Sequence, residues 1–160
     1  MPKGKTQVNY VVPQETAPGL AHVRIDTARL RFDGFLIVER VSPGLFTATQ
    51  MGQGPADGDS ITEQGVESTF VCEAGRCRSV TVRGRLVSLR GTGFRLAKEM
   101  RAWVDGREVR VAGFGPDREV EGMDRVELEL PEDIRGEVLV LLNADGFISN
   151  PAQMLIGAEL

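Results

Sequence analysis

The sequence has few of the residues and patterns on which several classes of protein depend. The longest uninterrupted apolar stretch, Val138 to Leu142, has five residues, whereas a membrane-spanning helix needs about 20. We therefore expect no insertion into a membrane. No apolar stretch follows Met1, so the chain as given carries no secretory signal. We expect it either to be cytosolic or to be a piece of a longer secreted protein.

Histidine is also scarce. His22 is the one histidine of the chain, and the G-x-S-x-G motif of a nucleophile elbow does not occur. The alternation around it places His22 on a strand face with Leu20 and Arg24, where it is expected to be solvated. We expect no catalytic residue, no metal and no cofactor.

The charge of the chain is modest but unevenly distributed. The formal net charge is −4 and the isoelectric point about 5.1, which argues against nucleic acid as a partner. Residues 73–110 hold ten basic and four acidic side chains, whereas residues 111–160 hold three and eleven. Such a distribution indicates either two differently charged solvated faces or a dipolar body that stacks on copies of itself.

Alternation of apolar and polar residues predicts an all-β fold. Residues 8–12 and 126–130 each alternate with the period of a strand, and helical periodicity is nearly absent. Tight turns are expected at Asp33-Gly34, Asp105-Gly106 and Asp145-Gly146. Many short strands between turns indicate an antiparallel sandwich. The same pattern predicts further strands at 65–72, 77–82, 85–90, 100–105, 108–112, 137–143 and 147–156.

Two segments of the chain resemble each other and suggest a repeat. Residues 8–25 (VNYVVPQETAPGLAHVRI) and 126–142 (VELELPEDIRGEVLVLL) each contain a strand, a proline, an acidic loop, a glycine and a second strand. We interpret each as a hairpin, and residues 1–43 as the C-terminal hairpin portion of a preceding sandwich repeat. Residues 44–61, rich in glycine and small polar residues, are expected to be a linker, and 62–160 an immunoglobulin-like sandwich.

The order of several short motifs resembles a known family. GTGF at 91–94 is followed by WVDGREV, GFGP, GMDRVELELP and DGFISNP. This order is similar to that of an uncharacterised family of C-terminal domains of large secreted bacterial proteins. The resemblance implies an immunoglobulin-like sandwich of the IPT/TIG type and an extracellular or cell-surface location. It implies no activity, because none is established for the family.

The two cysteines are best explained as a disulfide. Cys72 and Cys77 match a cysteine pair that the family carries ahead of GTG. A zinc site would need about four ligands, and only His22 is available besides them. A redox pair more often has two intervening residues. A disulfide across the tip of a hairpin would place the protein outside the cytosol.

Three further clusters could carry chemistry but have simpler explanations. Residues 57–60 (DGDS) could bind calcium, but a solvated turn is favoured because the spacing of an EF-hand is absent. Glu127 and Glu129 share a strand face, as a pair of glycosidase acids would, yet that face is the solvated one. Gly91 and Gly93 follow a strand without a subsequent helix, which indicates a bulge or tight bend and not a phosphate site.

A basic stripe and the single tryptophan are the candidate contacts for a partner. Trp103 is expected to point outward on its strand with Arg101 and Asp105, where it could bind a partner or a sugar ring or be covered by the N-terminal hairpin. The stripe could meet an acidic polymer or simply be solvated. Its members are Arg78, Arg83, Arg85, Arg90 and Arg95.

These patterns predict a non-catalytic extracellular β-sandwich module with a structural, adhesion or self-assembly role. Its partners would be copies of itself or neighbouring modules, bound through strand edges. Two alternatives are a polysaccharide-binding module, which would use Trp103 and the arginine stripe, and an accessory domain of a larger secreted enzyme.

Overall fold

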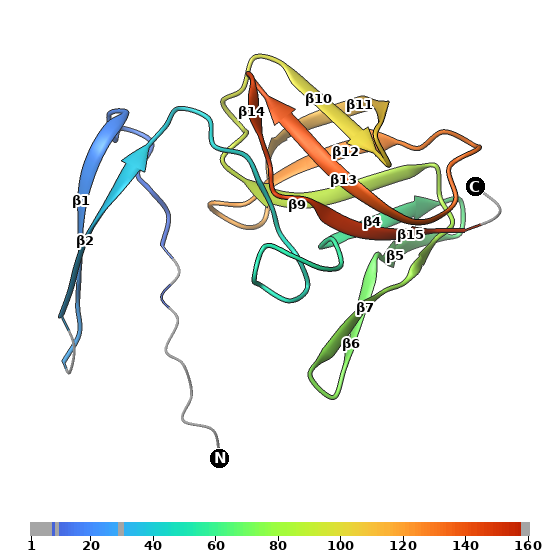
Figure 1. The fold of residues 1–160 in the computed structure, drawn as a ribbon, viewed down its shortest axis with the longest axis horizontal. Helices are drawn as coiled ribbons and strands as arrows, with labels where there is room; N and C mark the ends of the chain where they lie inside the picture. The colour runs from blue at the N-terminus through green and yellow to red at the C-terminus, as the bar shows by residue number, and fades with distance from the viewer. Residues whose placement is uncertain (1–7, 9, 29–30, 158–160) are drawn as a thin grey trace. The chain divides into compact units, whose positions relative to one another are not determined.

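The computed structural model describes residues 8, 10–28 and 31–157 (Figure 1). The chain divides into two compact units, Met1–Glu39 and Arg40–Leu160. The described part of the first unit contains one antiparallel hairpin, formed by β1 (Gly19–Asp26) and β2 (Arg31–Val38). Gly19 pairs with Val38 at one end and Asp26 with Arg31 at the other, so the strands pair along their whole length.

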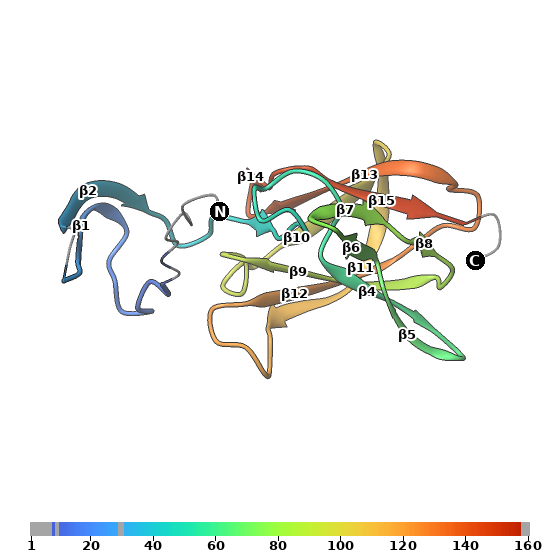
Figure 2. The same cartoon turned by 90° about the horizontal axis from the view of Figure 1, so that it is seen from below.

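The second unit is a sandwich of two β-layers (Figure 2). Strand β11 (Arg107–Pro116) belongs to both layers. The first layer also contains β3 (Gly44–Leu45), β4 (Gly58–Thr62), β5 (Gly65–Ser68), β9 (Leu86–Thr92) and β12 (Asp124–Glu129). The second contains β8 (Thr81–Val82), β10 (Met100–Val104), β13 (Gly136–Ala144), β14 (Phe147–Ile148) and β15 (Ala152–Ile156). Strands β6 (Phe70–Glu73) and β7 (Arg76–Ser79) form a separate hairpin.

Strand β11 passes from one layer to the other. Its first residues pair with β10, and from Arg110 onward it pairs with β12. The register shifts between Val111 and Gly113, which leaves one extra residue and lets the strand bend. All pairings between the strands of the second unit are antiparallel except that of β15 with β8.

The core lies between the layers and follows from the alternation of the strands. Val126 and Leu128 of β12 and Val87 and Leu89 of β9 are fully buried. Val140 and Leu142 of β13 face them from the opposite layer and are equally buried. Phe94 is the largest fully buried side chain. The prediction of an all-β immunoglobulin-like sandwich with an additional N-terminal hairpin is therefore confirmed.

The linker predicted at 44–61 is wrong. Leu45, Thr47 and Ala56 of this segment are buried, and β4 pairs with β9 along residues 58–61. The Asn150 side chain accepts a hydrogen bond from Leu45 N at 2.8 Å and donates to Leu45 O and Gly52 O. A segment poor in large apolar residues is thus held by distant polar groups, and the boundary between the units falls at 39/40 instead.

Both proposed hairpins of the repeat also differ from the structure. β12 and β13 lie in opposite layers and do not pair with each other. In the first unit, residues 8 and 10–13 form no strand, and residue 9 lies outside the described part. The observed hairpin pairs β1 with β2, so Asp33-Gly34 lies inside β2 and not in a turn.

The remaining turns and strands agree with the alternation. Asp105-Gly106 and Asp145-Gly146 both have positive φ at both residues, as tight hairpin turns require. The strand expected over 65–72 is divided into β5 and β6 at Thr69, whose buried hydroxyl donates to Ala56 O at 2.7 Å. The strand expected over 147–156 is divided into β14 and β15.

Candidate functional site

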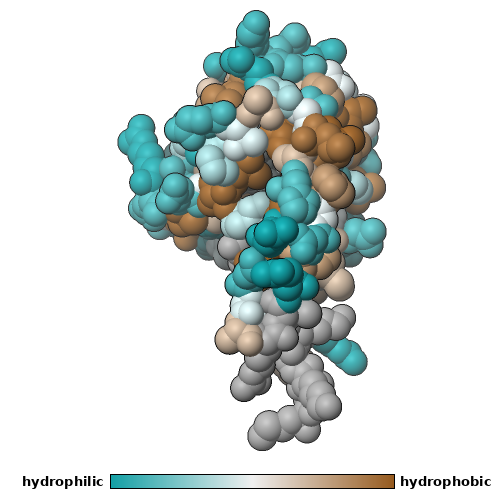
Figure 3. All heavy atoms as spheres, turned by 90° about the vertical axis from the view of Figure 1, so that its left-hand side faces the viewer, coloured by the Kyte–Doolittle hydropathy of each residue, from teal (hydrophilic) through white to brown (hydrophobic). Residues whose placement is uncertain are grey.

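The hairpin of the first unit carries apolar side chains on a solvent-exposed face. Leu20, Phe35 and Ile37 are 74%, 72% and 71% exposed. Leu20 pairs with Ile37, and His22 with Phe35, so these side chains are neighbours on one face, which we call the outer face of the hairpin. In the space-filling view, apolar (brown) areas lie at the surface between hydrophilic ones (Figure 3). Exposed apolar patches of this kind mark contact sites.

Beyond the apolar residues, the outer face of the hairpin carries polar side chains that bind one another. His22 Nε2 lies 3.1 Å from Asp33 Oδ1, and Arg24 Nε donates to the same oxygen at 2.9 Å. The rings of His22 and Phe35 lie 5.2 Å apart. His22 thus lies on the exposed face with Leu20 and Arg24, as the alternation predicted. Asp33 was not singled out from the sequence, because it looked like part of a turn.

Trp103 lies on the outer face of the second layer of the sandwich. Its neighbours Ala102 and Val104 are fully buried, whereas Trp103 is half-buried and pairs with Leu141 across the strands. Arg101 lies over its ring, 5.1 Å from the centroid. The outward orientation predicted for Trp103 is therefore correct.

The cation over Trp103 is held by a carboxylate. Arg101 donates two hydrogen bonds to Glu108, at 2.8 and 2.7 Å. This bidentate contact raises the pKa of Arg101 and lowers the pKa of Glu108. The guanidinium is thereby fixed against the ring, and a flat ligand that stacks on that side of Trp103 would have to displace it.

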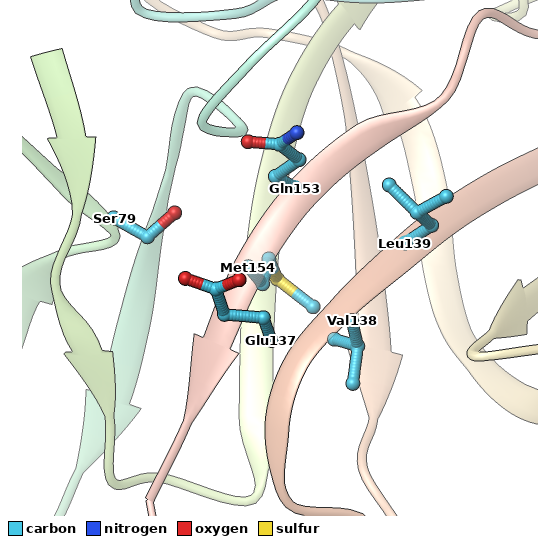
Figure 4. A pocket seen from close by; sticks show the side chains of 6 residues that line it. All are labelled: Ser79, Glu137, Val138, Leu139, Gln153 and Met154. Carbon is cyan, nitrogen blue, oxygen red and sulfur yellow. The ribbon is translucent and has the colours of Figure 1, made fainter.

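A shallow pocket of about 220 Å³ opens beside β13 and β15. Figure 4 shows that the hydroxyl of Ser79, the carboxylate of Glu137 and the amide of Gln153 point into the same space. Leu139 and Gln153 pair across the strands on the outer face that also carries Trp103. The remaining lining residues, Val138, Leu139 and Met154, are apolar. The pocket can accept hydrogen-bonding groups on a small apolar surface.

The arginines expected to form a basic stripe do not form one. Arg78 lies in the separate hairpin β6–β7, and Arg83 lies beyond β8; both are exposed. Arg85 donates to Glu132 at 2.5 Å. Arg90 and Arg95 are bound to aspartates in the first layer. The five arginines are near one another in sequence, but only Arg78 and Arg90 lie in strands, β7 and β9. Three of the five are paired with carboxylates.

The DGDS segment at 57–60 is part of an ion-pair network and not a solvated turn. Asp59 and Ser60 lie in β4, and Arg90 binds Asp57 at 2.7 Å and Asp59 at 2.5 Å. Arg125 lies 3.8 Å from Asp59 and donates to Asp117. Because arginine side chains already satisfy these carboxylates, calcium would have to compete with them for its oxygen ligands.

The ion pair of Asp117 with Arg125 should make the stability of the fold depend on pH. The hydrogen bond from Arg125, with those from Glu119 N and Val120 N, lowers the pKa of Asp117 from 3.8 to about 2. A carboxyl with a lowered folded pKa stabilises the fold above its unfolded pKa and loses this contribution as pH falls through the folded pKa. In urea titrations, Asp117→Asn should therefore be less stable than wild type at pH 7. The difference should shrink between about pH 4 and pH 2.

A matched control separates this carboxyl from the rest of the acidic surface. Glu121→Gln removes an exposed carboxylate that forms no ion pair with another residue of the described ranges. Its stability should follow that of wild type over the whole pH range. A gap between wild type and Asp117→Asn that stays constant from pH 7 to pH 2 would contradict the assignment.

The cysteines form the expected disulfide. Cys72 and Cys77 are bonded and lie opposite each other in β6–β7. The loop that they close is short, so the bond should stabilise by about 2 kcal/mol or less. Among the described residues, β6 and β7 pair only with each other and with no strand of either layer. We therefore expect the double variant Cys72→Ser, Cys77→Ser to loosen residues 70–79 locally. Limited proteolysis should cut this hairpin faster, while the melting temperature falls by only a few degrees.

A large effect on global melting would contradict this local role of the disulfide. If the double variant loses its cooperative melting transition, the disulfide supports the whole sandwich. Chemical reduction of wild type serves as the control for the serine side chains, since it opens the same bond without substitution.

Gly91 and Gly93 of the GTGF segment lie against the backbone of residues 42–44. Gly93 has φ +78°, and a Cβ there would lie 2.0 Å from Ser42 O. Ser42 N donates to Gly93 O at 2.8 Å. A Cβ on Gly91 would lie 2.4 Å from Gly44 O. The predicted tight bend is thus correct, and its cause is close backbone approach.

Asp124 holds the same segment and was missed from the sequence. Its side chain is fully buried, accepts from Phe94 N at 2.8 Å and Arg95 N at 3.0 Å, and pairs with Arg95 Nε at 2.5 Å. A signal was available, because Asp124 is in phase with Val126, Leu128 and Leu130 and must therefore face the core.

Two comparisons with known proteins found no match. No protein-family model matches the chain, and no curated protein matches it. Among the described residues there is no helix with the length and apolar character that crossing a membrane requires. Three features of the molecule bear on its function: the hairpin of the first unit, the outer face of the second layer around Trp103, and the disulfide.

Proposed function

We propose that the protein is a non-catalytic β-sandwich module that assembles with copies of itself in an extracellular or cell-surface structure. The observation that carries the proposal is the hairpin of the first unit. Within the described part of that unit, β1 and β2 pair only with each other, so one backbone edge of each strand is unpaired. Unpaired edges recruit strands, and a lone two-stranded hairpin is marginal in water.

The exposed side chains favour a protein partner over solvent. The outer face presents Leu20, Phe35 and Ile37 beside the paired charges of Arg24 and Asp33. An apolar area with a polar rim is typical of an interface. The Cys72–Cys77 disulfide supports an oxidising compartment.

Self-assembly should be visible in the mass of the protein in solution. The molar mass of wild type, measured by light scattering over a concentration series, should rise with concentration. The variant Leu20→Glu with Phe35→Gln should stay monomeric, because it removes the apolar centre of the outer face. Met51→Gln is the matched control, since it removes an apolar side chain that is 80% exposed in the second unit. It should assemble like wild type.

A constant monomeric mass of wild type at all concentrations would overturn self-assembly. Equal assembly of wild type and the double variant would show that the outer face is not the contact.

A second function is favoured by the outer face around Trp103. Trp103 and the pocket residues Leu139 and Gln153 lie on one face, where a ring and hydrogen-bonding groups could bind a polysaccharide. This predicts binding on a glycan array that Trp103→Ala abolishes. An array without signal would remove this candidate.

A further inference from the structure

The hairpin of the first unit repeats the strand register of the last hairpin of the sandwich. β1 with β2 and β13 with β15 each begin with a glycine opposite a branched aliphatic residue: Gly19 opposite Val38, and Gly136 opposite Ile156. The next four pairs follow without a shift. They are Leu20–Ile37, Ala21–Leu36, His22–Phe35 and Val23–Gly34 in the first unit, and Glu137–Leu155, Val138–Met154, Leu139–Gln153 and Val140–Ala152 in the second.

The segment that leads into each hairpin also corresponds. Gly19 has φ +135° and Gly136 has φ +84°, so each strand begins at a backbone conformation that favours glycine. Pro13 lies six residues before Gly19, and Pro131 lies five residues before Gly136. Each of these prolines accepts a hydrogen bond from the backbone three residues later. Thr16 N donates to Pro13 O at 3.0 Å, and Ile134 N donates to Pro131 O at 3.4 Å. The sequence similarity that suggested a repeat therefore has a structural counterpart.

The correspondence defines which face of the hairpin is built for a core. In the sandwich, Val138, Val140, Ala152, Met154 and Ile156 are buried against the opposite layer. In the first unit, the residues at the corresponding positions of the register are small or apolar, and we call the face that they form the inner face of the hairpin. They are Ala21, Val23, Gly34, Leu36 and Val38.

The opposite face corresponds to solvent positions. Leu20 takes the place of Glu137, which is exposed in the sandwich, and Phe35 takes the place of Gln153, also exposed. Only the inner face therefore corresponds to positions that are buried in the sandwich.

β13 and β15 each pair with a further strand, whereas β1 and β2 of the first unit do not among the described residues. β13 pairs with β10, with Val140 opposite Val104, and β15 pairs with β8. Within the described part of the first unit, β1 and β2 have no such neighbours. A fitting partner must offer a strand antiparallel to β1 and an apolar layer such as that of β9 and β12.

We propose that residues 19–38 complete an open immunoglobulin-like sandwich on another polypeptide, one that lacks its last two strands. The hairpin would take the place there that β13 and β15 take in the second unit. This inference rests on the proposed assembly function but uses the other face, since self-association was assigned to the outer face. Strand addition would supply backbone hydrogen bonds, and the inner face would supply the core.

The test uses an open sandwich of known sequence as the probe. Residues 40–135 of this chain, refolded together with the intact protein, should be captured in a one-to-one complex measured by size exclusion with light scattering. Val23→Asp in the intact protein should weaken capture about 100-fold or more, because it buries a charge without a partner. Leu20→Glu is the matched control, since glutamate is the residue at the corresponding position of β13. It should leave capture unchanged.

A peptide of residues 136–157 shows whether the probe can accept a hairpin. Capture of this peptide without capture of the intact protein would overturn the proposal. Equal capture by Val23→Asp and Leu20→Glu would do the same. The self-assembly test is independent, because Leu20→Glu with Phe35→Gln should abolish self-association while it preserves capture.

A second measurement decides the question if the probe accepts neither hairpin. In the full chain, residues 136–140 are replaced by the sequence of residues 19–23, and residues 152–156 by the sequence of residues 34–38. Residues 141–151 stay unchanged, so Asn150 keeps its hydrogen bonds to Leu45 and Gly52. The variant should still melt in one cooperative transition, with the melting temperature lowered by about 10–20 °C because Ala21 and Gly34 are smaller than the residues they replace. The same replacement with Val23→Asp should not fold. Loss of folding in both would overturn the proposal.

Discussion

Replacing Asp124 by alanine is expected to lower the free energy of unfolding by about 3–5 kcal/mol. The carboxylate is fully buried and accepts hydrogen bonds from Phe94 N and Arg95 N. Its removal leaves two backbone donors and the Arg95 guanidinium without their acceptor in a place from which water is largely excluded. The loss should be visible in equilibrium urea unfolding as a lower midpoint with an unchanged slope.

The control for Asp124 is a carboxylate of similar chemistry at the surface. Glu132 binds Arg85 at 2.5 Å, but its side chain is 71% exposed. Glu132→Ala should therefore change the free energy of unfolding by no more than about 1 kcal/mol. If the two alanine variants are equally stable, the hydrogen bonds of Asp124 do not hold the GTGF segment in place.

Asp124 also shows what alternation in a sequence can and cannot reveal. The period of two assigned β12 and its buried face correctly, and the same period places Asp124 on that face. A buried carboxylate must have partners, but the period does not say which. Its partners, Phe94 and Arg95, lie about 30 positions earlier in the chain, so only the folded topology brings them together.

Alternation in a sequence predicts strands but not which strands pair. The pattern of residues 126–142 favours a hairpin, because two strands flank a short acidic loop. In the structure the loop crosses between layers, so β12 pairs with β9 and β11 while β13 pairs with β10 and β15. A short connection fits both a hairpin and a crossing between packed sheets. The repeat could be noticed, but its register could not be derived.

Composition misled the assignment of residues 44–61 for a related reason. Glycine and small polar residues are typical of linkers, yet here they permit close contact. Thr47, Gly58 and Ser60 are buried, and a Cβ on Gly58 would lie 2.6 Å from Ser88 O. Gly84 N donates to the Ser60 hydroxyl at 3.0 Å. Backbone packed this tightly against a neighbouring strand needs small residues, so composition alone cannot distinguish it from a linker.

The second large effect is expected at Gly93, where the backbone of the GTGF segment lies against residue 42. Gly93→Ala should lower the free energy of unfolding by about 3 kcal/mol or more, since it combines a positive φ with overpacking. The added Cβ would lie 2.0 Å from Ser42 O, which is backbone and cannot rotate away. The hydrogen bond from Ser42 N to Gly93 O should be lost with it. Thermal and urea unfolding of the variant measure the total effect.

Gly106 provides the comparison that separates backbone strain from close approach. Its φ of +75° nearly equals the +78° of Gly93, but a Cβ there would meet no atom within 4 Å. Gly106→Ala should therefore lower the free energy of unfolding by only about 1–2 kcal/mol, the cost of the left-handed conformation alone. The excess at Gly93 measures the contact with residue 42. If the two variants lose equal stability, the backbone at residue 42 moves away from the added Cβ without loss of free energy. Glycine is then required at position 93 for its positive φ and not for the close contact.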